Sequence, residues 1–284
     1  MSVQHKAQRP VSWAAWGLIV LSILFVGIFI VLPGISILFM AFRQGMGEFV
    51  RGVTRRETME AVMLSLWVLV ITLPITAVFG MAAAWAVTKF QFPGKKLLLT
   101  LIDLPLSLSP IVVGLMFVLL YGRYGIFGEF LRTIGVRIIF APPGLVLTTL
   151  FILMPLVVRE LIPSMQELGS SEEEAALTLG APSWRMFWHV TLPNIRWALM
   201  YGLILSAARA AGEFGAASVV SGLIRGSTVT LPLQVEIYYN EYMSTMAFAS
   251  ASIFFVFAGF TLTAKTIIGR RVQKQRKTQG VSHE

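Results

Sequence analysis

Three ionisable side chains lie inside long apolar stretches of this sequence, where charges are costly. Asp103 stands in one such stretch, and Arg209 and Glu213 stand four residues apart in another. In a membrane, charges of this kind usually belong to a substrate pathway or to an ion pair. Residues four apart share one helix face, so Arg209 and Glu213 can neutralise each other. We favour a structural salt bridge, because a guanidinium held by a carboxylate has less to offer an anion.

Motifs for catalysis and metal binding are absent from the sequence. The histidines His5, His189 and His283 lie far apart and no cysteine is present, so we expect no metal site and no disulfide. A phosphate-binding G-x-x-x-x-G-K-[ST] loop is missing, since the Gly-Lys-Lys at 94–96 lacks the earlier glycine and the following hydroxyl. No G-x-S-x-G or H-E-x-x-H motif occurs. We therefore expect no catalytic residue, no bound cofactor and no ATP hydrolysis by this chain itself.

The composition indicates that lipid is the main solvent of the chain. Hydrophobic residues make up 56% of the 284 residues and charged residues only 13%, whereas soluble domains carry about 25% charged residues. A helix needs roughly 20 apolar residues to cross a bilayer. Runs of this kind lie at about 15–41, 61–88, 97–121, 138–158, 197–220 and 246–268. We predict an all-α, polytopic membrane protein with about six transmembrane helices.

The net charge of +9 is distributed mainly beside these spans. The basic cluster at the end of the chain contains no acid from Lys265 to Lys277, which favours contact with membrane lipid over binding of a nucleic acid. More Lys and Arg lie on the side of the termini than on the other side, so we expect both termini in the cytoplasm. The expected parts are a cytoplasmic segment 1–14, a transmembrane domain 15–268 and a basic cytoplasmic tail 269–284.

Prolines disturb two of the predicted spans. Pro142 and Pro143 interrupt the fourth run, which is the weakest of the six. Pro105 and Pro110 each remove an amide from the third run and disturb the carbonyl four residues back. Broken helices inside membranes often mark substrate sites, although a plain kink in a packed helix explains the same residues.

The polar segment EEEAALTLGAPSWRMFWHVTLPNI lies within the cytoplasmic loop that the topology predicts at about 159–196. Ser171 and Glu174 have the spacing of a capping box, in which hydroxyl and carboxylate each satisfy an orphan amide. Gly180 followed by Pro182 should end that helix. The segment is therefore predicted to begin with one short helix.

A second short helix is predicted to start near Ser183. Its aromatic residues Trp184, Phe187 and Trp188 should share one face, and Pro193 should stop it before the fifth span. The tryptophans are typical either of an interfacial belt or of a docking surface. Physical reasoning alone leaves both readings open.

The spacing of this loop resembles the EAA loop of permease subunits of ATP-binding-cassette importers. The matching positions are Glu174, Ala175, Ala176, Gly180, Val190, Leu192 and Pro193. The family usually has isoleucine where Val190 stands, a mild departure that keeps the apolar character. The resemblance implies a coupling helix that sits in a groove on a separate ATPase subunit, with all of these except Val190 as the coupling residues. ATP and Mg²⁺ would then be used by that partner.

Three other stretches resemble the sulfate and molybdate branch of these permeases. They are LPLSLSPIVVGL at 104–115, ARAAGEFGAASVVSG at 208–222 and TLPLQVEIYYNEY at 230–242, and the last two look most like W-type sulfate/thiosulfate permeases. The resemblance implies a type I importer-like fold in a bacterial inner membrane. It also implies a T-type permease partner in a heterodimer and a periplasmic sulfate-binding protein.

On this reading the residues expected along the anion path are Ser107, Ser109, Arg209 and Glu213, the serines offering hydroxyl donors. The same machinery could carry molybdate or tungstate, which are tetrahedral dianions like sulfate. An ATP-independent secondary anion transporter is the alternative from another class, although the halves of the sequence show no convincing self-similarity.

Overall fold

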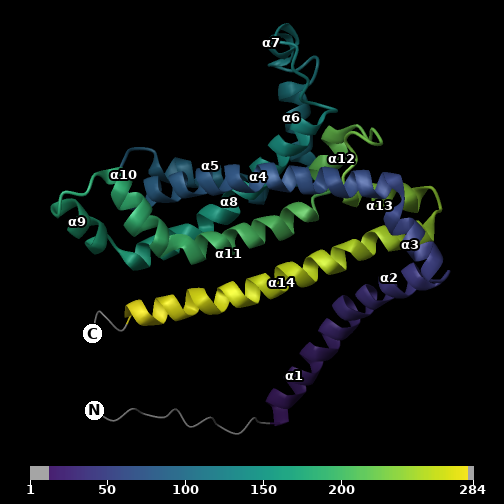
Figure 1. Ribbon diagram of the computed structural model, residues 1–284, viewed down its shortest axis with the longest axis horizontal. Helices are drawn as coiled ribbons and strands as arrows, with labels where there is room; N and C mark the ends of the chain where they lie inside the picture. Colours follow the sequence, from purple (N-terminus) through teal and green to yellow (C-terminus); the bar gives the residue numbers. More distant parts are fainter. Residues whose placement is uncertain (1–12, 281–284) are drawn as a thin grey trace.

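The computed structural model describes residues 13–280 (Figure 1), and these contain helices and no strand, which confirms the all-α class. Four helices are long and apolar enough to cross a membrane, and two bent helix pairs pass the same test together, in agreement with about six spans. The elements in chain order are α1 (Trp13–Val26), the π-helical turn η1 (Gly27–Val31), α2 (Leu32–Phe42), α3 (Met46–Thr54), α4 (Arg56–Lys89), α5 (Lys95–Ser107), α6 (Pro110–Tyr121), α7 (Gly128–Thr133), α8 (Pro142–Leu168), α9 (Ser171–Thr178), α10 (Ser183–Met186), the π-helical turn η2 (Phe187–Thr191), α11 (Leu192–Ala211), α12 (Gly215–Ser221), α13 (Leu231–Asn240) and α14 (Ser244–Gly280).

The centre of the bundle is formed by α4, α8 and α11, with α8 packed against both of the others. A Cβ atom at Gly80 would lie 2.5 Å from Val157 Cγ1, and one at Gly202 would lie 3.2 Å from the Val157 Cα. Small residues let helix backbones approach closely inside a membrane. The three helices therefore meet around Val157, which is fully buried.

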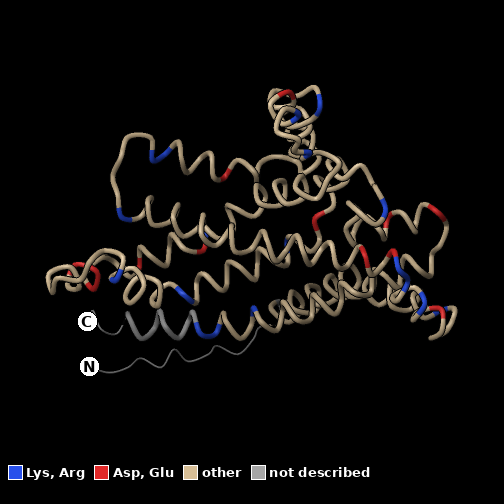
Figure 2. Tube along the Cα trace, turned by 45° about the horizontal axis from the view of Figure 1, so that its top comes forward, with Lys and Arg blue, Asp and Glu red and all other residues tan. Residues whose placement is uncertain are grey.

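The first span stands apart from this centre. It runs through α1, η1 and α2, its apolar window is not buried at all, and α2 packs on α14. Charged residues gather mainly at the two ends of the bundle and on α7 (Figure 2). The predicted segment 1–14 lies outside the described residues except for its last two, and α14 continues as a helix through the predicted tail as far as Gly280.

The third predicted span is two half-helices rather than one kinked helix. The axes of α5 and α6 differ by 112° across residues 108–109. Ser109 has φ −63° and ψ 136°, because the residue before a proline is disfavoured in the helical region. Pro105 lies inside α5 without ending it, so the break is due to Pro110 and its predecessor.

A second break divides α11 from α12, whose axes differ by 56°. The two breaks face each other, because α6 packs on α12. A Cβ atom at Gly215 would lie 2.8 Å from Pro110 Cβ, and one at Gly114 would lie 2.8 Å from Val219 Cβ. The half-helices are therefore in close contact, with no room for larger side chains at either glycine.

The prediction for the fourth span was wrong about its first two prolines and about its far end. Pro142 and Pro143 occupy the first turn of α8 instead of interrupting it, where their missing amides would be unpaired anyway. The helix then extends beyond residue 158 to Leu168 and includes Pro155 and Pro163. The non-helical part of the predicted loop 159–196 therefore begins only at Gly169.

Candidate functional site

The first candidate site is the segment between α8 and α11, residues 169–191. Its helix α9 begins one residue earlier than the capping-box prediction implied, with Ser170 as the N-cap. The Ser170 hydroxyl donates to the Glu174 carboxylate. No side-chain hydrogen bond to a helix amide is formed at this cap, so the predicted capping box at Ser171 is wrong. The three acids of the first turn still lie where the helix dipole favours negative charge.

The end of α9 is a tight turn that depends on Gly180, as predicted. Gly180 has φ +82°. Its amide donates to the Leu177 carbonyl at 2.9 Å, and the Ala181 amide donates to the Ala176 carbonyl at 3.0 Å, the pair of bonds that defines a Schellman motif. Nothing lies within 4 Å of a Cβ atom built at this glycine. Glycine is thus required here because φ is positive, and not because a side chain would clash with other residues of this chain.

The outer surface of the segment carries several large apolar side chains that are exposed. Leu179 is 88% exposed and Trp184 is 66% exposed, and Leu177 and Trp188 are also exposed. Phe187 behaves differently, because its ring packs 5.7 Å from the Trp85 ring on α4. The predicted aromatic face is therefore divided: the tryptophans face outward while Phe187 attaches the segment to the bundle.

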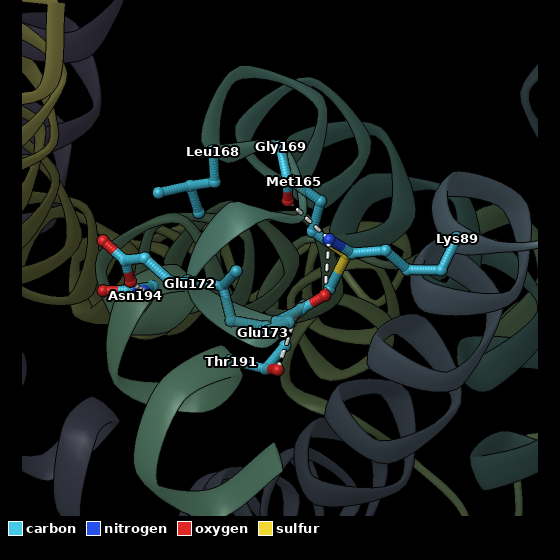
Figure 3. A pocket seen from close by; sticks show the side chains of 9 residues that line it. Lys89, Met165, Leu168, Gly169, Glu172, Glu173, Thr191 and Asn194 are labelled. Carbon is cyan, nitrogen blue, oxygen red and sulfur yellow. Dashed lines mark hydrogen bonds and ion pairs between the residues drawn. The ribbon is translucent and has the colours of Figure 1, made fainter. Parts of the chain in front are cut away.

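The inner side of the segment is polar and joined to the bundle (Figure 3). Glu173 Oε2 lies 2.7 Å from Lys89 Nζ at the end of α4, and Glu173 Oε1 accepts a hydrogen bond from Thr191 Oγ1 at 2.8 Å. Lys89 Nζ also donates to the Gly169 carbonyl at 2.6 Å. Asn194 Nδ2 donates to Glu172 Oε2 at 2.5 Å. Sequence reasoning missed these links, because their members are far apart in the chain.

The second short helix does not stop at Pro193, contrary to the prediction. Residues 183–211 form one helical path through α10, η2 and α11, with Pro193 in the first turn of α11. The wider turn η2 precedes the proline, and the Leu192 amide donates to the Phe187 carbonyl. Proline lacks the amide that would continue the regular ladder, and a π-helical turn absorbs such a defect. Leu192 packs against a buried cluster that contains Ile195, away from the outer surface.

The second candidate site is the break between α11 and α12. The predicted pairing is confirmed: Arg209 Nη1 lies 2.6 Å from Glu213 Oε2, in an ion pair rather than an aligned hydrogen bond. The pair does not share one helix face, however, because α11 ends at Ala211. Glu213 Oε1 instead accepts the Ala216 amide of α12 at 3.0 Å. The side chain of Glu213 is 5% exposed and that of Arg209 is 38% exposed.

A small cavity adjoins Glu213 between α4, α8, α11, α12 and α13. Its volume is about 20 Å³, enough for roughly one water. Hydroxyl groups of Ser65, Thr149 and Thr230 belong to its lining residues. The Thr230 hydroxyl is buried and has no hydrogen-bond partner among the described residues. The break is therefore lined by groups that can bind a small polar molecule.

The structure does not bring the predicted serines into this cavity. Ser107 and Ser109 are exposed at the break between α5 and α6 and are not among the cavity's lining residues. Asp103 is paired, with Oδ1 2.8 Å from Arg159 Nε on α8. Among residues 13–280 there is no group of three His, Cys, Asp or Glu that could hold a metal ion.

Comparison with known proteins identifies the family to which this chain belongs. The protein family described as the binding-protein-dependent transport system inner membrane component matches residues 76–274. The sulfate transport system permease protein CysW of Synechococcus elongatus is 47% identical over 92% of this chain and 91% of its own length. The sulfate transport system permease protein CysT of Escherichia coli is 33% identical, over 88% and 92%.

A solved structure shares the fold. A bacterial alginate ABC transporter, determined in complex with an alginate pentasaccharide-bound periplasmic protein, contains a chain that superposes with a TM-score of 0.76 at 18% identity. The superposition covers 92% of this chain and 96% of that one. The chain therefore belongs to the binding-protein-dependent transport system inner membrane components, and it is a multi-pass membrane permease of an ABC importer.

Proposed function

We propose that this chain is the W-type permease subunit of an ATP-driven sulfate importer. The observation that carries the proposal is the 47% identity, over nearly the whole chain, to a permease named for sulfate transport. The lower identity to a CysT permease supports pairing with a related T-type subunit in a heterodimer. Thiosulfate, a tetrahedral dianion of similar shape, is the second substrate.

The segment 169–191 is the coupling segment that docks on the ATPase partner. Support comes from its exposed apolar surface, formed around Leu179 and Trp184, since exposed apolar patches mark interaction sites. The residues assigned to coupling remain Glu174, Ala175, Ala176, Gly180, Leu192 and Pro193, of which Leu192 and Pro193 act by starting α11. ATP and Mg²⁺ are used by the partner, because the chain has no phosphate-binding loop.

The coupling segment and both termini face the cytoplasm of a bacterial cell, with 15–268 as the transmembrane domain that contains this segment and 269–284 as a basic tail. Support comes from the excess of Lys and Arg on this side. The opposite end then faces the periplasm, where a sulfate-binding protein delivers the anion. A periplasmic protein bound to the alginate transporter is consistent with this arrangement.

The anion passes beside the two helix breaks. Ser107 and Ser109 are exposed there and offer hydroxyl donors to a dianion, while the unpartnered Thr230 hydroxyl offers another. Arg209 and Glu213 fix the geometry of the break by pairing with each other. Broken helices near a membrane centre are where transporters commonly bind their solutes.

Reconstitution tests this function. The chain, a T-type permease, the ATPase chain and the binding protein are placed in proteoliposomes, and accumulation of labelled sulfate is measured with and without ATP. We expect accumulation only with ATP and the ATPase chain, and weaker competition by molybdate than by unlabelled sulfate. Accumulation by the isolated chain would indicate a secondary transporter. Stronger competition by molybdate than by unlabelled sulfate would indicate that molybdate is the preferred substrate.

A further inference from the structure

The attachment of α9 to the rest of the bundle is unusual in being almost entirely polar. No residue of α9 is buried, and its main packing partners are α10 and η2, which lie close to it in the chain. Apolar burial, which fixes most helices in place, therefore contributes little to its position. What fixes α9 must lie in its links to the core helices.

Most of those links converge on one ion pair (Figure 3), and a separate hydrogen bond joins Glu172 of α9 to Asn194 of α11. Lys89 and Glu173 are only 16% and 13% exposed, with Nζ and Oε2 separated by 2.7 Å. Each makes one further hydrogen bond, Lys89 to the Gly169 carbonyl at 2.6 Å and Glu173 from Thr191 at 2.8 Å. Charged groups that are this well enclosed, and that each make a further hydrogen bond, form a specific contact rather than a loose surface pair.

The pair and its two hydrogen-bond partners lie next to the ends of three core helices. Lys89 is the last residue of α4, where a cation also complements the helix dipole. Gly169 follows the last residue of α8, and Thr191 precedes the first residue of α11. The ends of α4, α8 and α11 are thus tied to α9 through one ammonium group and one carboxylate.

We propose that the Lys89–Glu173 pair is the joint through which motion of the coupling segment is transmitted to α4, α8 and α11. Glu173 and Lys89 are positioning residues, distinct from the outward-facing Glu174. The inference rests on the proposed function, because it presumes that an ATPase moves α9. Without the pair, α9 docks on the ATPase but keeps only the polypeptide chain and the Glu172–Asn194 hydrogen bond as links to α8 and α11. Most of its motion is then lost before it reaches the three helices.

The test uses the complete reconstituted complex with Lys89→Met or Glu173→Gln. The ATPase chain should still co-purify and hydrolyse ATP, while sulfate transported per ATP falls at least about tenfold. Lys96→Met is the matched control, since Lys96 is exposed and makes no ion pair among the described residues; its transport ratio should be unchanged. The conservative variant Lys89→Arg and the exchange Lys89→Glu with Glu173→Lys should each recover part of the ratio, which loss of folding alone would not explain.

A second measurement does not depend on the ATPase. Because the chain has no cysteine, cysteines introduced at the exposed positions Thr178 and Leu97 can carry spin labels. The distance distribution between α9 and α5 should be narrow in the wild-type background and broad with Lys89→Met.

The outcomes separate the two proposals. Three results would overturn the proposal that the Lys89–Glu173 pair transmits motion. They are an unchanged ratio of sulfate to ATP in both single variants, an equally narrow distance distribution, and loss of the ATPase chain from the complex. A wild-type complex that shows no ATP-dependent sulfate uptake would overturn the proposed function instead, whatever the spin-label distances show.

Discussion

Replacement of Arg209 by alanine separates a structural from a solute-binding role for this residue. The substitution leaves the Glu213 carboxylate 5% exposed, with the Ala216 amide as its only hydrogen-bond donor among the described residues. A buried charge that loses its partner destabilises a protein by about 3–5 kcal/mol. Arg209 itself is partly exposed, so solvent screening lowers the expected loss to about 2 kcal/mol.

This loss should be visible in thermal unfolding of the purified complex. One kcal/mol shifts the Tm of a chain of this size by about 2–4 °C, so Arg209→Ala should lower the Tm by about 4–8 °C and reduce sulfate uptake. Adding Glu213→Gln removes the stranded charge, and the glutamine oxygen can still accept the Ala216 amide. The double variant should therefore recover most of the Tm and, if the pair is structural, most of the uptake.

The control variant Arg225→Ala breaks an exposed ion pair with Glu241, which should cost no more than about 1 kcal/mol. A double variant that recovers its Tm but not its uptake would refute the structural reading and place Arg209 in contact with the anion. Normal Tm and normal uptake in Arg209→Ala would remove the residue from both roles.

Three further predictions concern glycines and the outer surface. Gly180→Val, at φ +82°, should strain the turn by about 1–2 kcal/mol and lower ATPase stimulation without affecting membrane insertion, whereas Gly180→Asn should be tolerated better; equal stimulation by both would contradict this. Gly80→Val should lower the Tm through overpacking worth about 1–3 kcal/mol, and adding Val157→Ala should relieve it; no relief would place the strain elsewhere. Leu179→Glu and Trp184→Ala should each reduce co-purification of the ATPase chain, and full recovery of the complex would exclude this surface from docking.

Local patterns in the sequence predicted local structure well. Hydropathy located the spans because a bilayer imposes one length and one polarity on them all. The turn at Gly180 was predictable because a left-handed residue has a strong preference for glycine. The pairing of Arg209 with Glu213 was predictable because the two are close in the chain, even though the helix ends between them.

Prolines and long-range contacts were harder to predict. Pro142 and Pro193 each lie in the first turn of a helix, whereas the sequence predicts that they interrupt or stop one. The same residue type begins or breaks a helix according to its surroundings. The contact between Lys89 and Glu173 joins elements distant in sequence. No periodicity or motif indicates such a pair, since it exists only once packing has brought α9 beside the end of α4.

The interlocked glycines at the two breaks have a mechanical consequence for alternating access. Gly114 and Gly215 hold α6 and α12 in contact without space for a Cβ atom, so neither half-helix can slide past the other. A rotation at residues 212–214 must then swing α6 about residues 108–109 as well. The two breaks would then act as paired hinges of one rigid unit formed by α6 and α12. A disulfide introduced between α6 and α12 should leave alternating access intact, whereas a disulfide between this unit and α8 should block it.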